Sequence, residues 1–318
     1  MRVLKPPRLH YRDVIGIAAP ASPPPDPKAI DRSVAALESL GFRTRLAPNV
    51  RKRWGFLAGT DQERASDLMT LFADKEVDAI FCVRGGYGAG RLLPLLDYKL
   101  IRANPKILVG YSDITALHCA LLRKAGLVSF HGPMLNSDLI KPGLPEYTLQ
   151  GLLRTLMRPA APGSICQGYR QKTISVLQTG FASGRLVGGN ISLLCAALGT
   201  PFEPPFKRKI LFFEEVDEPP YRLDRMLTQL LAGGRLRSVA GIAVGRNRNC
   251  HDPKAGRGNE YRQTLEDVLR ERLLPLGVPL VIGLPFGHVR HNATLPVGAR
   301  ASLNTETGDL VILEPAVG

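Results

Sequence analysis

The sequence predicts an α/β protein, in which a doubly wound, mostly parallel sheet domain is followed by a smaller C-terminal α/β domain. Short apolar runs alternate along the chain with longer segments that repeat apolar residues at helical spacing, as parallel strands joined by helices do. With 318 residues, of which 44% are hydrophobic and 22% charged, the chain is long enough for two domains with a deep core.

Residues 1–157 are expected to form the N-terminal domain. Its expected strands are residues 14–19, 77–83, 107–109 and 127–130. One amphipathic helix is expected over residues 27–40, and a second runs from the capping box Thr60-Asp-Gln-Glu63 to about Ala73. A third helix follows Ser112, with apolar residues recurring on one face.

Residues 158–183 carry no helical period and are expected to connect the two domains. The C-terminal domain, residues 184–318, resumes the alternation. Its expected strands are residues 186–187, 210–213, 239–244 and 280–282. One expected helix follows Gly188-Gly189-Asn190 and ends at Leu198, and two more are expected from about residue 223 to 232 and over residues 261–273. Residues 301–303 and 310–313 flank a turn and predict a terminal hairpin.

The net charge of +14 is spread evenly over both halves of the chain. Nucleic-acid binding is not expected, because such proteins cluster their charge among aromatic residues, which are only 6% here. A positive field also attracts small acidic substrates. The apolar stretch after Asp13 spans only about eight residues and contains Pro20, so it is a poor match to a signal peptide. No run approaches the roughly 18 apolar residues of a membrane span. Five scattered cysteines read as free thiols, so a cytoplasmic protein is expected.

A serine lies where an expected strand gives way to a helix, in I-L-V-G-Y-S-D-I-T-A-L at residues 107–117. At such a turn the hydroxyl is exposed, and the following N–H groups point toward whatever lies above it. Ser112 is therefore a candidate nucleophile beside an oxyanion site. The alternative is that Ser112 only caps the helix.

A glycine-rich loop, Arg84-Gly-Gly-Tyr-Gly88, directly follows the strand expected over residues 77–83. Glycines let the backbone approach a ligand and present its N–H groups. The spacing is not G-x-G-x-x-G, and no acidic residue ends a strand about 20 residues later, so no nicotinamide cofactor is expected. The loop predicts a cradle for an oxyanion or a carboxylate.

Four carboxylates follow the strand expected over residues 210–213: Glu214, Glu215, Asp217 and Glu218. Strand ends are where α/β proteins build their sites. Mg²⁺ or Ca²⁺ binding is the alternative, although the loop lacks the spacing of a calcium loop. Because side chains alternate along a strand, Glu214 and Glu215 should point to opposite sides.

Two histidines follow the last expected strand, in L-P-F-G-H-V-R-H at residues 284–291. His288 and His291 could bind zinc, but no third ligand stands nearby, and the loop Cys250-His251-Asp252 is a similarly weak metal candidate. A serine needs a histidine to take its proton, and the histidine needs a carboxylate to orient it. Serine, acid and histidine each follow an expected strand here, so three loops could meet in one cleft.

Several motifs occur together, in order, over residues 14–313: V-I-G-I-A-A-P-A-S at 14–22, R-G-G-Y-G at 84–88, G-Y-S-D at 110–113, G-G-N-I-S-L-L at 188–194, F-E-E-V-D-E-P-P-Y-R at 213–222, L-P-F-G-H at 284–288 and T-L-P-V-G at 294–298. Together they resemble the LD-carboxypeptidase family, the muramoyl-tetrapeptide carboxypeptidases. These are serine peptidases with a Ser–Glu–His triad.

The resemblance implies that Ser112 is the nucleophile, Glu214 the acid and His288 the base. The N–H of Asp113 and one from Gly85 or Gly86 would bind the oxyanion. The implied substrate is a cell-wall tetrapeptide that loses its terminal D-alanine, with no metal or cofactor. A homodimer is also implied.

Two alternatives remain. Relatives that confer immunity to peptide–nucleotide antibiotics use the same triad, but extra aromatic loops would be expected, and this chain has one tryptophan, Trp54. A non-catalytic binder of muropeptides is the other, and the intact triad argues against it.

Overall fold

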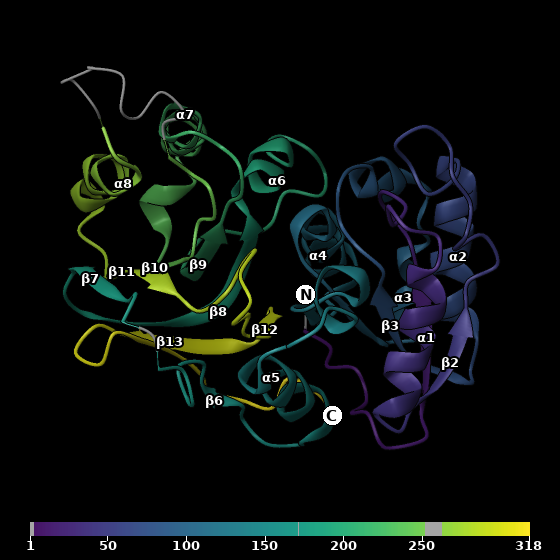
Figure 1. Ribbon diagram of the computed structural model, residues 1–318. Helices are drawn as coiled ribbons and strands as arrows, with labels where there is room; N and C mark the ends of the chain where they lie inside the picture. The colour runs from purple at the N-terminus through teal and green to yellow at the C-terminus, as the bar shows by residue number, and fades with distance from the viewer. Residues whose placement is uncertain (1–2, 171, 252–262) are drawn as a thin grey trace.

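The computed structural model describes residues 3–170, 172–251 and 263–318, which form two sheets with their helices (Figure 1). The first sheet has six strands in the order β12-β5-β4-β3-β1-β2. Every neighbouring pair is parallel except β12 with β5. The bounds are β1 (Val14–Ala18), β2 (Arg43–Leu46), β3 (Val77–Cys82), β4 (Ile107–Gly110), β5 (Ser129–His131) and β12 (Leu295–Val297).

The second sheet has eight strands in the order β6-β14-β13-β8-β9-β10-β11-β7. Its centre, β8-β9-β10-β11, is parallel, and its outer strands pair antiparallel. The bounds are β6 (Gly163–Ser164), β7 (Ser175–Gln178), β8 (Phe181–Asn190), β9 (Lys209–Glu214), β10 (Gly241–Gly245), β11 (Leu280–Leu284), β13 (Arg300–Asn304) and β14 (Asp309–Ile312). The expected α/β class and the terminal hairpin, β13–β14, are confirmed.

One helix of the N-terminal half lies between the two sheets, where it packs against α6 (Ile191–Ala196) (Figure 1). This is α4 (Thr115–Ala120), which follows the Ser112 turn and is buried throughout. The remaining helices are α1 (Ala29–Ser39), α2 (Asp61–Ala73), α3 (Tyr98–Ala103), α5 (Glu146–Met157), α6 (Ile191–Ala196), α7 (Pro220–Ala232) and α8 (Leu265–Leu273). No helix in these described ranges is long and apolar enough to cross a membrane.

Capping boxes set the start of two helices. The Glu63 backbone N–H donates to Thr60 Oγ1 at 3.2 Å, and the Thr60 N–H donates to Glu63 Oε2 at 2.9 Å, so α2 begins where the sequence predicts. Thr264 and Asp267 form the same box at α8. That cap explains why α8 begins at Leu265, later than the expected start at residue 261, which lies outside the described residues.

The chain crosses between the sheets more often than the sequence indicates. Residues 158–183 hold β6, β7 and the start of β8, so this segment contributes strands to the second sheet. β12, from the C-terminal half, joins the first sheet. The C-terminal Gly318 exchanges backbone hydrogen bonds with the segment Pro6–Arg8. The boundaries at 157 and 183 remain a prediction.

The strand β8 should depend strongly on Gly188. It has a φ of +158°, and a Cβ there would lie 1.8 Å from the carbonyl oxygen of Phe212 on the neighbouring strand. We expect Gly188→Ala to lower the free energy of unfolding by about 3 kcal/mol, because backbone must shift. Gly151→Ala is the control, because no atom lies within 4 Å of a Cβ built there. Alanine in helix α5 should raise the free energy of unfolding by about 0.5–1 kcal/mol. Urea unfolding measures the stability of both variants. Equal stabilities of the two variants would contradict the close approach of Gly188 to the Phe212 carbonyl.

Candidate active site

Ser112 stands in a strained turn at the carboxyl end of β4. It opens a short 3-10 turn, Ser112–Ile114, that leads directly into α4. Its φ is +62°, a left-handed conformation that costs a non-glycine residue on the order of 1–3 kcal/mol and that recurs at functional sites. The capping alternative is wrong, because Tyr111 and Ile114 hold the N-cap positions and no side chain caps either turn.

The glycine-rich loop after β3 packs directly against this turn. A Cβ on Gly85 would lie 2.9 Å from Ser112 Cβ and 3.2 Å from the Asp113 backbone nitrogen, so only glycine permits this approach. Gly86, with a φ of +103°, packs instead against Ser22. The structure therefore brings Gly85 and Asp113 together beside Ser112 and places Gly86 one step further away.

Two buried charged residues hold the loop. Asp113 accepts a hydrogen bond from the Ala89 backbone N–H at 2.7 Å, and burial raises the pKa of its carboxyl to about 6. The fully buried Arg64 donates to the Gly88 carbonyl at 2.9 Å and pairs with Asp61 at 2.6 Å. The position of the glycine-rich loop relative to Ser112 is thus fixed from both sides.

Glu214 and His288 form a hydrogen-bonded pair beyond the carboxyl ends of β9 and β11, two parallel strands of the second sheet that flank β10. Glu214, the last residue of β9, is fully buried, and its Oε2 lies 2.6 Å from His288 Nδ1. Gly287 has a φ of +110°, and a Cβ there would lie 2.9 Å from Glu214, so the pair requires glycine before the histidine. Burial alone would lower the pKa of His288, but the charge and hydrogen bond of Glu214 outweigh it and raise this pKa.

Glu215 points the other way, as the alternation along the strand predicts. Its carboxylate accepts hydrogen bonds from Asn190 Nδ2 at 2.6 Å and from Ser192 Oγ at 2.6 Å. The Val216 N–H also donates to it, at 2.9 Å. Burial raises the pKa of Glu215 despite these donors. Only Glu214 of this pair reaches His288.

The Ser112 turn and the Glu214–His288 pair come from different sheets but approach each other through aromatic contact. The ring of Tyr111, next to Ser112, lies edge-on to the His288 ring with 4.9 Å between centroids. On the other side of the turn, the Asn190 N–H donates to Thr115 Oγ1 at 2.9 Å. Sequence reasoning missed Tyr111 and Asn190, and their places in G-Y-S-D and G-G-N were the available signal.

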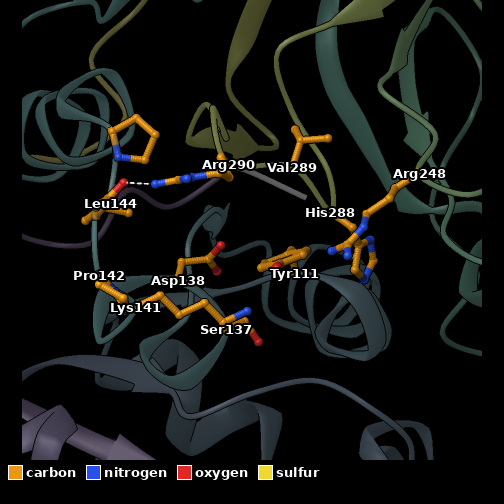
Figure 2. Close-up of a pocket in the computed structure, with 12 residues that line it drawn as sticks. Tyr111, Ser137, Asp138, Lys141, Pro142, Leu144, Arg248, His288, Val289 and Arg290 are labelled. Atoms are coloured by element: carbon orange, nitrogen blue, oxygen red, sulfur yellow. Dashed lines mark hydrogen bonds between the residues drawn. The ribbon is translucent and has the colours of Figure 1, made fainter.

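A pocket of 460 Å³ opens beside His288. Figure 2 shows Arg248 and His288 at one end of this view, Lys141, Pro142 and Leu144 toward the other, and Tyr111 between them. Asp138 lines the same pocket, and burial raises the pKa of its carboxyl to about 6. Sequence analysis missed this wall, because residues 137–145 carry no motif. The lining residues are Tyr111, Ser137, Asp138, Lys141, Pro142, Gly143, Leu144, Pro145, Arg248, His288, Val289 and Arg290.

The described residues do not bring the candidate metal ligands together. His291 packs against the rings of Tyr147 and Tyr169, both at 5.8 Å, rather than beside His288 and its partner Glu214. In residues 3–170, 172–251 and 263–318, no three or more His, Cys, Asp or Glu side chains are grouped as metal ligands. The loop Cys250-His251-Asp252 was the third metal candidate, and its Asp252 lies outside the described residues.

Comparisons with known proteins agree over most of the chain. Residues 15–132 match the LD-carboxypeptidase N-terminal domain, and residues 183–303 match the LD-carboxypeptidase C-terminal domain. The chain is 41% identical to the probable murein peptide carboxypeptidase of Bacillus subtilis, over 97% of this chain and 94% of that protein.

Two solved structures are also similar over nearly the full length. Muramoyltetrapeptide carboxypeptidase from Oxalobacter formigenes matches with a TM-score of 0.81 and 31% identity, over 95% of this chain and 99% of that one. The microcin C7 self immunity protein MccF, in complex with aspartyl sulfamoyl adenosine, matches with a TM-score of 0.89 and 25% identity, over 99% and 100%. The chain therefore belongs to the LD-carboxypeptidase family and is a carboxypeptidase.

Proposed function

We propose that this carboxypeptidase uses Ser112, Glu214 and His288 to release the terminal D-alanine from murein tetrapeptides. The observation that carries the proposal is the 2.6 Å contact between Glu214 Oε2 and His288 Nδ1, which leaves the second ring nitrogen for a serine proton. The strained turn that presents Ser112 lies next to the Tyr111 ring that touches His288. The substrate class follows the names of the similar proteins from Bacillus subtilis and Oxalobacter formigenes.

The proposed reaction has two steps. His288 Nε2 takes the Ser112 proton as the hydroxyl oxygen attacks the scissile carbonyl carbon, and the resulting imidazolium is stabilised by the Glu214 carboxylate. The same proton then passes to the leaving amine of D-alanine as the C–N bond breaks. Water, deprotonated by His288, hydrolyses the acyl-enzyme and restores the serine.

The oxyanion would be held by backbone N–H groups on either side of Ser112. The N–H of Asp113 is the first donor, and Gly85 is favoured over Gly86 for the second because it packs on Ser112. Each donor of this kind contributes on the order of 3 kcal/mol to transition-state stabilisation. The Asp113–Ala89 hydrogen bond and the Arg64 contacts preorganise this pair.

The likeness to MccF keeps a peptide–nucleotide substrate as the second candidate. Such a substrate needs an aromatic surface for its base. Among the described residues of the pocket wall, Tyr111 is the one aromatic side chain apart from His288, and it packs on that histidine. Trp54 lies elsewhere and is exposed. The pocket therefore favours the murein peptide.

Location in the cytoplasm and assembly as a homodimer remain predictions.

The assay that tests the proposal measures D-alanine release from a murein tetrapeptide by chromatography. We expect release by the wild type, with or without a chelator, and none by Ser112→Ala. An aminoacyl sulfamoyl adenosine serves as the rival substrate. Because the φ of +62° suits glycine, Ser112→Gly should also be inactive yet more stable than Ser112→Ala by about 1 kcal/mol. Turnover retained by the alanine variant would exclude serine catalysis.

The two glutamates of the strand end provide a matched pair of variants. Glu214→Gln keeps the volume but removes the charge that orients and stabilises His288, so kcat should fall about a thousandfold or more. Glu215 accepts hydrogen bonds from Asn190 and Ser192 instead, so Glu215→Gln should alter stability more than kcat. Steady-state kinetics and thermal unfolding of both variants decide. A reversed order of the kcat losses would shift the acid by one residue.

The titration of His288 should report its partner directly. Glu214 raises the pKa of this ring, so the neutral base accumulates only above the ordinary imidazole value of 6.5, and activity should rise with pH through that range. Asp113 and Asp138, each with a pKa of about 6, titrate nearby, so the kinetic profile alone is ambiguous. NMR titration of the His288 ring separates the protonation of this histidine from that of Asp113 and Asp138. Glu214→Gln should lower its pKa, and an unchanged value would contradict the pairing.

A further inference from the structure

We propose that Arg248 binds the terminal carboxylate of the substrate and thereby restricts the enzyme to peptide ends. This inference rests on the proposed function, because it concerns the leaving group of the same reaction. An exopeptidase must distinguish a free carboxylate from a continuing chain, and an arginine fork that accepts both carboxylate oxygens does so through charge and geometry together.

The backbone of Arg248 is fixed to the segment that carries the acid. Its N–H donates to the Glu215 carbonyl at 3.0 Å, and its own carbonyl accepts from the Asp217 N–H at 2.9 Å. These two bonds form a parallel bridge between Val216 and Arg248. The guanidinium therefore starts from a position fixed relative to Glu214, whichever way the long side chain turns.

Three cationic side chains of the described residues line the pocket: Lys141, Arg248 and Arg290. Arg290 donates to the Gly143 carbonyl and so holds the rim of the pocket. Lys141 lies near enough to Asp138 for its charge to lower the pKa of that carboxyl, and Figure 2 shows it on the side of the pocket away from Arg248. Arg248 is exposed, has no ion-pair partner in the described part of the chain, and lines the wall with His288 (Figure 2).

The length of the leaving group selects the same residue. A single terminal residue places its carboxylate carbon only about 4 Å from the scissile carbonyl carbon, roughly one residue along the chain. The cation that binds it must therefore stand beside the catalytic histidine rather than at the far end of a 460 Å³ pocket. Of the three cations, Arg248 is the one that Figure 2 shows at the His288 end.

The test compares a tetrapeptide with a free terminal carboxylate against the same peptide with a terminal amide. We expect the wild type to prefer the free acid strongly. Arg248→Gln should lower kcat/KM for the acid by about 30- to 100-fold and change that for the amide little, since a charge-assisted contact is lost only with the acid. Arg248→Lys should recover part of the loss. Lys141→Gln, at the other end of the pocket, is the matched control and should keep the preference.

A binding measurement separates the inference from the proposed function. In the Ser112→Ala background, calorimetry should show tighter binding of the acid than of the amide, and adding Arg248→Gln should remove that difference. If the wild type releases no D-alanine, the proposed function fails and calorimetry still decides the role of Arg248. An acid preference that survives Arg248→Gln, in turnover or in binding, overturns the inference.

Discussion

The proposed catalytic geometry depends on the antiparallel pairing of β12 with β5. The proposed nucleophile follows a strand of the first sheet, whereas Glu214 and His288 follow strands of the second. Seven residues after His288, the chain enters the first sheet as β12, where Leu295 pairs with His131 at the end of β5. The histidine loop is therefore tied to both sheets, and a rigid-body movement between the sheets would break backbone hydrogen bonds.

A second contact acts at the other side of the Ser112 turn, and it explains why an apparently redundant glutamate is buried. The Asn190 N–H donates to Thr115 Oγ1, and the Asn190 side chain donates to Glu215. Glu215 thus joins the start of α4 to the strand end that carries Glu214. Its buried carboxylate has hydrogen-bond donors on both oxygens, which offset the cost of removing that group from water.

Local signals were enough to predict the elements that carry the site, but not the surfaces that complete it. Apolar runs located β4 and β9, and the Thr60 capping box located α2, because their signals lie within a few residues. β12 contains Pro296, and β7 has exposed residues without alternation, so neither reads as a strand until tertiary pairing supplies its partner. The pocket wall at residues 137–145 depends on long-range contacts that no local pattern encodes.

The distribution of charge in the site gives the general basic excess a more specific meaning. Glu214 is fully buried and paired with His288, so its charge acts mainly on the imidazole and little on the pocket. Lys141, Arg248 and Arg290, by contrast, are exposed around the opening. A net charge of +14 draws anionic ligands toward the molecule from a distance, within the limits of salt screening. At the pocket, the role proposed for Arg248 uses the same sign of charge to select the end of a peptide that carries a carboxylate.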